Sequence, residues 1–479
     1  MTHRHLLLIV VFAAIFSFDL ARATDMDFWW HVRTGQLIAE TGVVPTTDPF
    51  SYTATDRPWV VHEWLWDLGA FQLTSVGGYR LAVVVSATLV LLAYIILYRL
   101  LRRLGANEIV SAVLVLWAAV LALPNLGVRP REVTHLFLAV YLHRLLLYRA
   151  GLVRQLWVLP VVMLLWVNVH GAFVLGLGVL GLVTVGETIR WRWQGGPSPR
   201  HLWVVLGTTL AAVAVNPRGP WMLLYPFKYY LAADNPSFRI VTEFASPNFH
   251  EPMMLLFAAG LIGCVLLGLP AAKGGVSGGL LAVAFVAQAL GSTRQVSVCA
   301  MVLAPLLAQR LGEQFAWARE RPVPRLPWRF VALNWAVLVF LVGAAAVALT
   351  ARPEWRAKLQ LDEKPLVGEM PEAGVRFIEA NDLPGQVFNA QEWGGYLIYR
   401  WYPSRRVFID GRVDMYGTEV VNDYLKVVTV KEDWREVLDR NAVRTVLTGR
   451  DSALSVLLLA NGGWQRVFRG EVEDVFVRP

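Results

Sequence analysis

The chain has 479 residues, of which 56% are hydrophobic and 17% are charged, and it carries a net charge of +8. Soluble domains average about 25% charged residues, so this composition excludes an ordinary soluble protein. The basic residues are spread between apolar segments and form no single soluble patch, which argues against a nucleic-acid partner.

The apolar segments are the dominant feature of the sequence. About eleven of them approach the ~20 residues that span a bilayer, and the shorter ones would also suit re-entrant half-helices. They lie at 6–23, 80–101, 107–124, 132–148, 155–169, 172–190, 201–216, 253–271, 277–292, 295–311 and 330–350. This pattern predicts a polytopic α-helical membrane protein with about 11 transmembrane helices.

The distribution of Lys and Arg predicts the orientation, because these residues favour the cytoplasmic side. If the N-terminus is cytoplasmic, the short inner segments are rich in arginine and the C-terminus lies outside. Residues 1–23 also suit a cleavable signal peptide that ends at Ala21-Arg22-Ala23. Cleavage there would leave the downstream topology unchanged.

Two long outer loops are expected within a membrane domain of residues 1–350. The first loop, 24–79, reads as two amphipathic helices, Phe28–Glu40 and Pro58–Val76, on either side of a turn. Its tryptophans suit helices that lie in the membrane interface. The second long loop, 217–252, has the same character.

Residues 351–479 change in composition, since charge rises and long apolar runs vanish. Short β-like runs alternate with helical patterns, which predicts a soluble, extracytoplasmic α/β domain. The β-like runs are 386–389, 406–409, 443–448, 463–468 and 473–477, and the helical patterns are 372–381, 418–428 and 432–440. The Trp393–Tyr396 and Asp410–Arg412 motifs suit turns that fix this fold; a surface that recognises an acceptor is the alternative interpretation.

Polar clusters gather on the expected outer side of the membrane. They include Asp25, Asp27, His31, His62, Glu63, Arg129, Arg131, His170, Arg218, Glu243, His250 and Arg294. Each has an ordinary explanation, such as an arginine bound to a lipid headgroup. Together they favour a phosphate-bearing lipid substrate, because arginine binds phosphate bidentately and a carboxylate can accept a proton from a hydroxyl. An ion-coupled transporter would instead carry polar groups near the bilayer midplane.

The opening Asp25–Trp30, followed by a proline turn and by Trp59–Trp64, resembles the first outer loop of GT-C-fold glycosyltransferases. The resemblance implies that this loop carries the catalytic acid and that the donor is a polyprenyl-phosphate-linked sugar. It also implies a GT-C-like membrane domain, and many members of the superfamily end in a soluble outer domain.

A broad group of uncharacterised bacterial membrane proteins shows a more specific resemblance over most of the chain. The shared segments are Asp25–His31, Trp166–Gly171, Asn216–Gly219, Glu243–Pro247, Trp393–Leu397 and Phe408–Arg412. This likeness implies a multi-pass protein of the bacterial cytoplasmic (inner) membrane.

The function implied by the resemblance is an inverting glycosyltransferase that acts on a glycan, lipid or protein acceptor outside the membrane. Asp25 or Asp27 would be the general base; many GT-C members carry an adjacent Asp-Glu pair here, so the choice between the two stays open. Arg129, Arg131, Arg218 or Arg294 would hold the donor phosphate, and His31, His62, Glu63, His170, Glu243 and His250 would position substrate.

Asp25 and Asp27 also suit Mg²⁺ or Mn²⁺ as ligands, and some superfamily members need a metal whereas others do not. We expect the two aspartates to converge with His62 or Glu63, and with an outer arginine, on a single cavity. The alternative function is a non-catalytic membrane protein that binds or translocates a lipid-linked glycan.

Overall fold

The computed structural model describes residues 3–21, 25–227, 242–268, 275–319, 327–351 and 370–478. It consists of two compact units. The first comprises the described residues within Met1–Ala23, Val83–Pro226 and Val241–Asp362, and the second those within Thr24–Ala82, Phe227–Ile240 and Glu363–Pro479.

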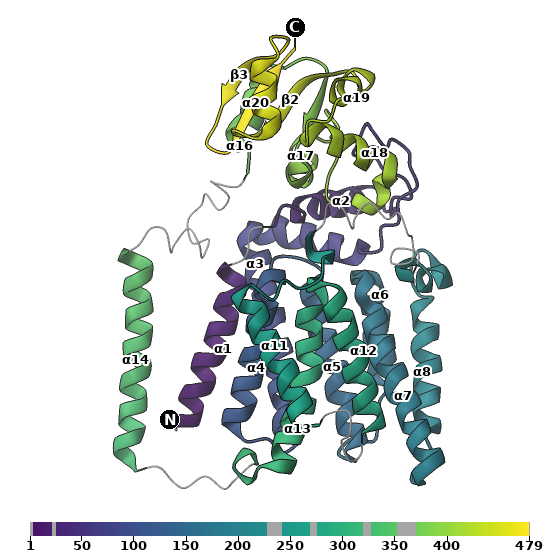
Figure 1. Cartoon of the computed structure of the whole chain (residues 1–479), viewed down its shortest axis with the longest axis vertical. Coiled ribbons are helices and arrows are strands. Elements are labelled where there is room, and N and C mark those ends of the chain that lie inside the picture. Colours follow the sequence, from purple (N-terminus) through teal and green to yellow (C-terminus); the bar gives the residue numbers. More distant parts are fainter. Residues whose placement is uncertain are drawn as a thin grey trace. The chain divides into compact units, whose positions relative to one another are not determined.

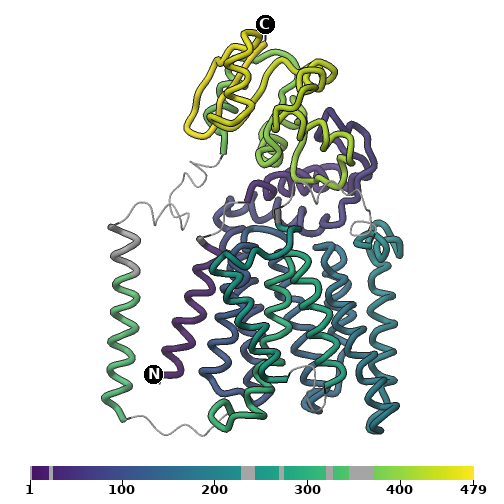
Figure 2. Tube along the Cα trace, viewed as in Figure 1, coloured from purple at the N-terminus to yellow at the C-terminus, as the bar shows by residue number. Residues whose placement is uncertain are grey.

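The first unit is a set of apolar helices that run alongside one another (Figures 1 and 2). Each predicted apolar segment contains a helix among its described residues. The helices are α1 (His3–Ala21), the second half of α3 (Trp64–Arg103), α4 (Glu108–Ala122), α5 (Arg131–Arg149), α6 (Val158–Val169), α7 (Val174–Gln194), α8 (Arg200–Val213), α11 (Pro252–Leu266), α12 (Val276–Gly291), α13 (Val296–Gln314) and α14 (Trp328–Ala351).

Among the described residues, five helices are long and apolar enough to cross a membrane, namely those that contain α1, α3, α4, α7 and α13. The protein is therefore a mostly helical membrane protein, and the full number of crossings stays a prediction.

Small residues let these helices pack closely. A Cβ atom on Gly186 of α7 would lie 2.6 Å from the Cα atom of Ser277 in α12, so the two backbones touch there. Small residues at helix contacts are typical of membrane bundles, where lipid and side chains are equally apolar and close packing drives association.

The second unit begins with the first loop. Helix α2 (Phe28–Thr41) confirms the first predicted amphipathic helix, and it ends at Gly42, whose φ of 70° and bond to the Ile38 carbonyl form a left-handed cap. The second predicted helix was placed too early, since α3 begins at Trp64 rather than at Pro58. Thr47 and Pro58 form a β-bridge, which keeps the chain extended before α3. Gly77 and Gly78 then kink α3.

The C-terminal part of this unit is a small α/β structure, as predicted. Its sheet has the strand order β1-β2-β4-β3, in which β1 is parallel to β2 and the other pairs are antiparallel. The strands are β1 (Gln386–Asn389), β2 (Val443–Gly449), β3 (Gln465–Arg469) and β4 (Glu473–Val477), and the helices are α16 (Glu372–Ala380), α17 (Gly394–Trp401), α18 (Val413–Val428), α19 (Trp434–Arg440) and α20 (Ala453–Ala460).

Two sequence-based interpretations of this part were wrong. Residues 406–409 form no strand. Val407 instead makes an isolated β-bridge to Ser51 of the first loop. Gly394 and Gly395 begin helix α17 rather than forming a turn. In both places the local pattern was overridden by contacts with distant parts of the chain.

The first loop and the C-terminal segment belong to the same unit. The Tyr52 amide donates to the Val407 carbonyl at 3.1 Å, and the Val407 amide donates to the Phe50 carbonyl at 3.1 Å. Hydropathy alone had grouped loop 24–79 with the membrane helices instead. Whether residues 351–479 fold alone stays a prediction.

The contact between α2 and α3 gives a first test. A Cβ atom at Gly35 would lie 1.9 Å from the Asp67 carbonyl oxygen, so Gly35→Ala must push the helices apart. We expect a loss of about 1–3 kcal/mol, the usual cost of overpacking, in thermal unfolding of the detergent-solubilised protein. Gly69→Ala is the control, because a Cβ atom at Gly69 would meet nothing within 4 Å. Equal melting temperatures for the two variants would contradict this packing.

Candidate active site

Asp25 and Asp27 occupy different environments at the start of α2. Asp25 is 2% exposed, and its Oδ1 atom accepts the backbone amide of Asp27 at 2.9 Å. This is a local turn of the kind that aspartate side chains commonly close. Asp27 is only half-buried. Asp25 therefore shapes the backbone, whereas Asp27 presents the more accessible carboxylate.

A first-loop cluster of acids and histidines lies one helical turn further on. His31 Nδ1 lies 2.6 Å from Asp67 Oδ1, and His31 Nε2 lies 3.8 Å from Glu63 Oε2. His62 Nε2 lies 3.4 Å from Glu63 Oε1. Three predicted site residues, His31, His62 and Glu63, are thus brought together. Asp67 was missed, although its position four residues after Glu63 is the spacing that places two side chains on one helix face.

The charges in this cluster are coupled. Burial alone would lower the pKa of His62, but the charge and hydrogen bond of Glu63, together with Asp414, raise it to about 9. Burial would also lower the pKa of His31, but the hydrogen bond and charge of Asp67, with Glu63 and Asp27, raise it. Burial raises the pKa of Asp67 to about 6 against the influence of His31. His62 is therefore a cation at neutral pH.

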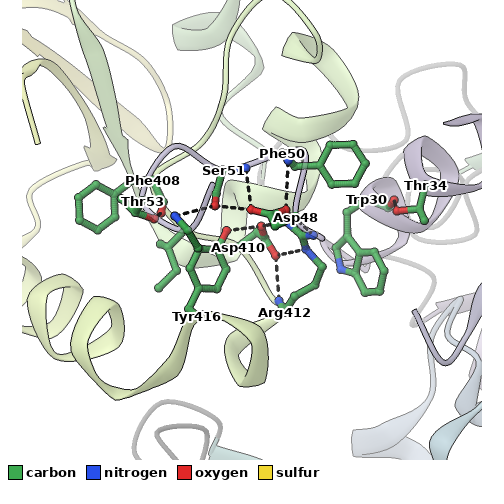
Figure 3. Close-up of polar contacts among 12 residues, drawn as sticks. Trp30, Thr34, Asp48, Phe50, Ser51, Thr53, Phe408, Asp410, Arg412 and Tyr416 are labelled. Atoms are coloured by element: carbon green, nitrogen blue, oxygen red, sulfur yellow. Dashed lines mark hydrogen bonds and ion pairs between the residues drawn. The ribbon is translucent and has the colours of Figure 1, made fainter. Parts of the chain in front are cut away.

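Arg412 links the first loop to the C-terminal segment through buried ion pairs (Figure 3). Its Nη1 atom donates to Asp48 Oδ1 at 2.9 Å, and its Nε and Nη2 atoms donate to the two oxygens of Asp410 at 2.8 and 2.6 Å. The guanidinium also lies 4.4 Å from the centre of the Trp59 ring. Asp48 therefore pairs with the Asp410–Arg412 motif, a contact that no sequence spacing predicts.

An arginine cluster lies in the first unit, around Glu243. Arg131 Nη2 lies 2.7 Å from one Glu243 oxygen, and Arg129 Nη1 lies 3.5 Å from the other. Arg131 also donates to Asn125 Oδ1 at 2.7 Å. Burial alone would raise the pKa of Glu243, but Arg131, Arg294 and Arg129 lower it to about 2. Three arginines thus keep the Glu243 carboxylate ionised at neutral pH.

The segment that carries Glu243 is also held by η6 (Thr293–Gln295) and the residue before it. The hydroxyls of Ser292 and Thr293 donate to the Glu243 carbonyl at 2.9 and 3.0 Å. The Arg294 guanidinium lies 5.5 Å from the centre of the Phe244 ring. The backbone of Glu243 is therefore anchored independently of its side chain.

The remaining predicted residues have other surroundings. His170 is buried, and its Nδ1 atom shares a 2.7 Å hydrogen bond with Thr134, which also accepts from the Trp166 indole at 2.9 Å. This arrangement ties α5 to the end of α6. Arg218 and His250 are exposed on loops, and the backbone amide of each is held by an asparagine side chain.

Within the described ranges, no group of three or more His, Cys, Asp or Glu side chains has an arrangement suited to a metal ion. Metal dependence through Asp25 and Asp27 stays a prediction. So does the expected convergence of the two aspartates with an outer arginine, because the acids and histidines of the first loop belong to one unit and the four predicted phosphate-binding arginines belong to the other.

The raised pKa of His62 makes a pH-dependent contribution to stability. The folded state holds the His62 proton up to about pH 9, whereas an unfolded histidine releases it near 6.5. The stabilisation is therefore complete below pH 6.5 and is lost as pH rises through about 9. Across this window we expect the melting temperature of the parental protein to fall more than that of His62→Gln. His250→Gln, at an exposed site, should follow the parental curve; a His62→Gln curve parallel to the parental one would refute the coupling.

Comparisons with known proteins show which fold this chain shares. No family model matches the sequence, and no curated protein matches it. Among solved structures, the apo oligosaccharyltransferase of Archaeoglobus fulgidus is similar, with a TM-score of 0.51 and 13% identity over 92% of this chain and 69% of that one. The archaeal oligosaccharyltransferase AglB from Archaeoglobus fulgidus, in complex with an inhibitory peptide and a dolichol-phosphate, gives a TM-score of 0.53 at 12% identity, with the same coverage.

The arabinofuranosyltransferase AftD from Mycobacteria is also similar, with a TM-score of 0.50 and 13% identity. The match covers 100% of this chain but only 40% of AftD. Identities this low establish a shared fold and leave activity to be tested. The chain has the GT-C fold of membrane glycosyltransferases.

Proposed function

We propose that this protein is a membrane glycosyltransferase that moves a sugar from a polyprenyl-phosphate donor to an acceptor outside the cytoplasmic membrane. The observation that carries the proposal is the half-buried Asp27 beside an acid–histidine cluster, in a chain with the GT-C fold. A dolichol-phosphate is bound in one of the similar structures, which supports a lipid-phosphate donor. The two long loops and the C-terminal domain would then face outward.

Asp27 is the proposed general base. Its carboxylate would accept the proton of an acceptor hydroxyl while the hydroxyl oxygen forms a bond to the anomeric carbon of the sugar. The bond between that carbon and the donor phosphate oxygen breaks, and polyprenyl phosphate leaves with the electron pair. Asp25 would act indirectly, because its side chain is already engaged in closing the turn that presents Asp27.

The arginine cluster is the proposed site for the donor phosphate. Among the described residues, the guanidinium groups of Arg129, Arg131 and Arg294 all act on the Glu243 carboxylate, and such a group of arginines is suited to bind an anion. Arginine suits phosphate because its planar fork donates two parallel hydrogen bonds. The Glu243 carboxylate pairs with Arg131 and Arg129, so a phosphate would have to compete with it.

Metal use is a separate part of the proposal. Asp25 and Asp27 are the residues that would hold Mg²⁺ or Mn²⁺, and such a cation would neutralise charge on the departing phosphate. The second candidate function is a non-catalytic protein that binds or translocates a lipid-linked glycan. It requires the arginines but no base, so the two functions differ in their dependence on Asp27.

Substitution of the two aspartates tests the base. Asp27→Asn should lower sugar transfer about 10²–10⁴-fold, the usual contribution of general base catalysis, without loss of folding. Asp25→Ala should mainly lower the melting temperature, at a cost of about 1 kcal/mol for a lost turn bond. The assay follows labelled sugar from polyprenyl-phosphate mannose and polyprenyl-phosphate arabinose in membranes that contain each variant. Parental transfer by Asp27→Asn would remove Asp27 as base and favour the binding protein.

Binding of farnesyl phosphate tests the arginine cluster. We expect Arg131→Gln to weaken binding by about tenfold or more, because a charge-assisted hydrogen bond to phosphate contributes roughly 1.5–3 kcal/mol. Glu243→Gln should strengthen binding, since it removes the competing carboxylate. Arg376→Gln is the control, because Arg376 forms an exposed pair with Glu372 in α16. Isothermal titration in detergent measures all three; unchanged affinity in Arg131→Gln would exclude this phosphate site.

A further inference from the structure

The Asp410–Arg412 turn lies directly against the proposed base. A Cβ atom at Gly411 would lie 1.9 Å from Asp27 Oδ1 and 2.7 Å from Asp27 Cγ. Real Cβ atoms do not approach other atoms so closely, so any side chain at position 411 must displace the Asp27 carboxylate or the turn. Only glycine permits this contact.

A second glycine brings the same segment against the backbone next to Asp27. A Cβ atom on Gly395, in the first turn of α17, would lie 2.5 Å from the Met26 carbonyl oxygen and 3.1 Å from Trp30 Cδ1. The two glycines come from different elements of the C-terminal segment. Together they contact the residues on both sides of Asp27 as well as its carboxylate.

The turn that carries Gly411 is held rigidly. The Arg412 backbone amide donates to Asp410 Oδ1 at 2.9 Å, and the Arg412 guanidinium binds both Asp410 and Asp48 (Figure 3). The Tyr416 hydroxyl donates to Asp410 as well. Because Arg412 is only 3% exposed, loss of either acid would leave its charge partly unpaired in the interior, which is costly. These bonds hold the first loop and the Asp410–Arg412 turn in one fixed arrangement.

We infer that Gly411 and the Asp410–Arg412 turn are positioning elements for Asp27. The C-terminal α/β segment then sets the reactivity of a residue near the start of the chain, rather than serving only as a docking module. This inference rests on the proposed function. Its physical basis is that catalysis depends steeply on placement, and a shift of about 1 Å can cost about 10²-fold in rate.

The test compares Gly411→Ala with Gly374→Ala in the full-length protein. Gly374 lies in α16, and a Cβ atom there would lie 2.8 Å from Glu473 Cγ, so the control creates a clash among C-terminal residues instead of at Asp27. Donor kinetics are measured with polyprenyl-phosphate mannose or polyprenyl-phosphate arabinose, according to which donor the parental enzyme accepts. We expect Gly411→Ala to lower kcat by about 10²-fold with little change in the donor KM, and Gly374→Ala to lower the melting temperature with near-parental kcat.

A second readout does not depend on turnover. Hydrogen exchange of the amides in residues 25–31 should accelerate in Gly411→Ala and stay parental in Gly374→Ala. Parental exchange and parental kcat in Gly411→Ala would overturn the inference, as would equal losses of kcat in both variants. If exchange responds as expected but the parental protein transfers no sugar, the proposed function fails while the positioning of Asp27 stands.

Arg412→Lys is the milder variant if Gly411→Ala does not accumulate as folded protein. Lysine keeps the charge but loses the fork that engages Asp410 and Asp48 together. We expect Arg412→Lys to lower kcat and to accelerate hydrogen exchange in residues 25–31, each by less than Gly411→Ala does. Parental values of both in Arg412→Lys would then overturn the inference.

Discussion

The buried guanidinium of Arg412 is the interaction on which the second unit depends. It joins Asp48 and Asp410, and Asp48 precedes Arg412 by 364 residues in the sequence. A charge held away from water is tolerated only when its partners are close and its hydrogen bonds are made. The pair therefore permits few arrangements of the first loop against the C-terminal segment, and the contact between Asp27 and Gly411 follows from that restriction.

Both candidate clusters mix acidic and basic groups, but among the described residues their basic members differ: histidines in the first loop and arginines around Glu243. In the first loop, Asp27, Glu63 and Asp67 face His31 and His62, and the histidines are held towards their protonated forms. Among the described residues around Glu243, the charges of Arg131, Arg294 and Arg129 all act on its carboxylate. Proton abstraction from an acceptor requires the first kind of site, and stabilisation of a departing phosphate requires the second. A chain with the GT-C fold that carries both kinds has the chemical groups for glycosyl transfer.

Glycine serves close packing in both units. Gly186 lets α7 touch α12, Gly35 lets α2 touch α3, and Gly395 and Gly411 let the C-terminal segment touch the start of the first loop. In the membrane helices such contacts substitute for a hydrophobic driving force. In the second unit they bring backbone and carboxylate together at distances that a side chain would prevent.

The sequence by itself determined the class of protein, the helical segments, the amphipathic helix expected at Phe28–Glu40 and most of the strands of the C-terminal sheet. These features follow from hydropathy, periodicity and capping residues, which are local properties. It also identified Asp27, His31, His62, Glu63 and the arginines as chemically unusual, because polar residues near apolar spans are costly. Only the tertiary structure decided that Asp67 orients His31, that Asp48 pairs with Arg412, that residues 406–409 form no strand and that Gly411 supports Asp27. Those outcomes depend on contacts between residues far apart in the chain, and side-chain spacing along a sequence carries no information about such contacts.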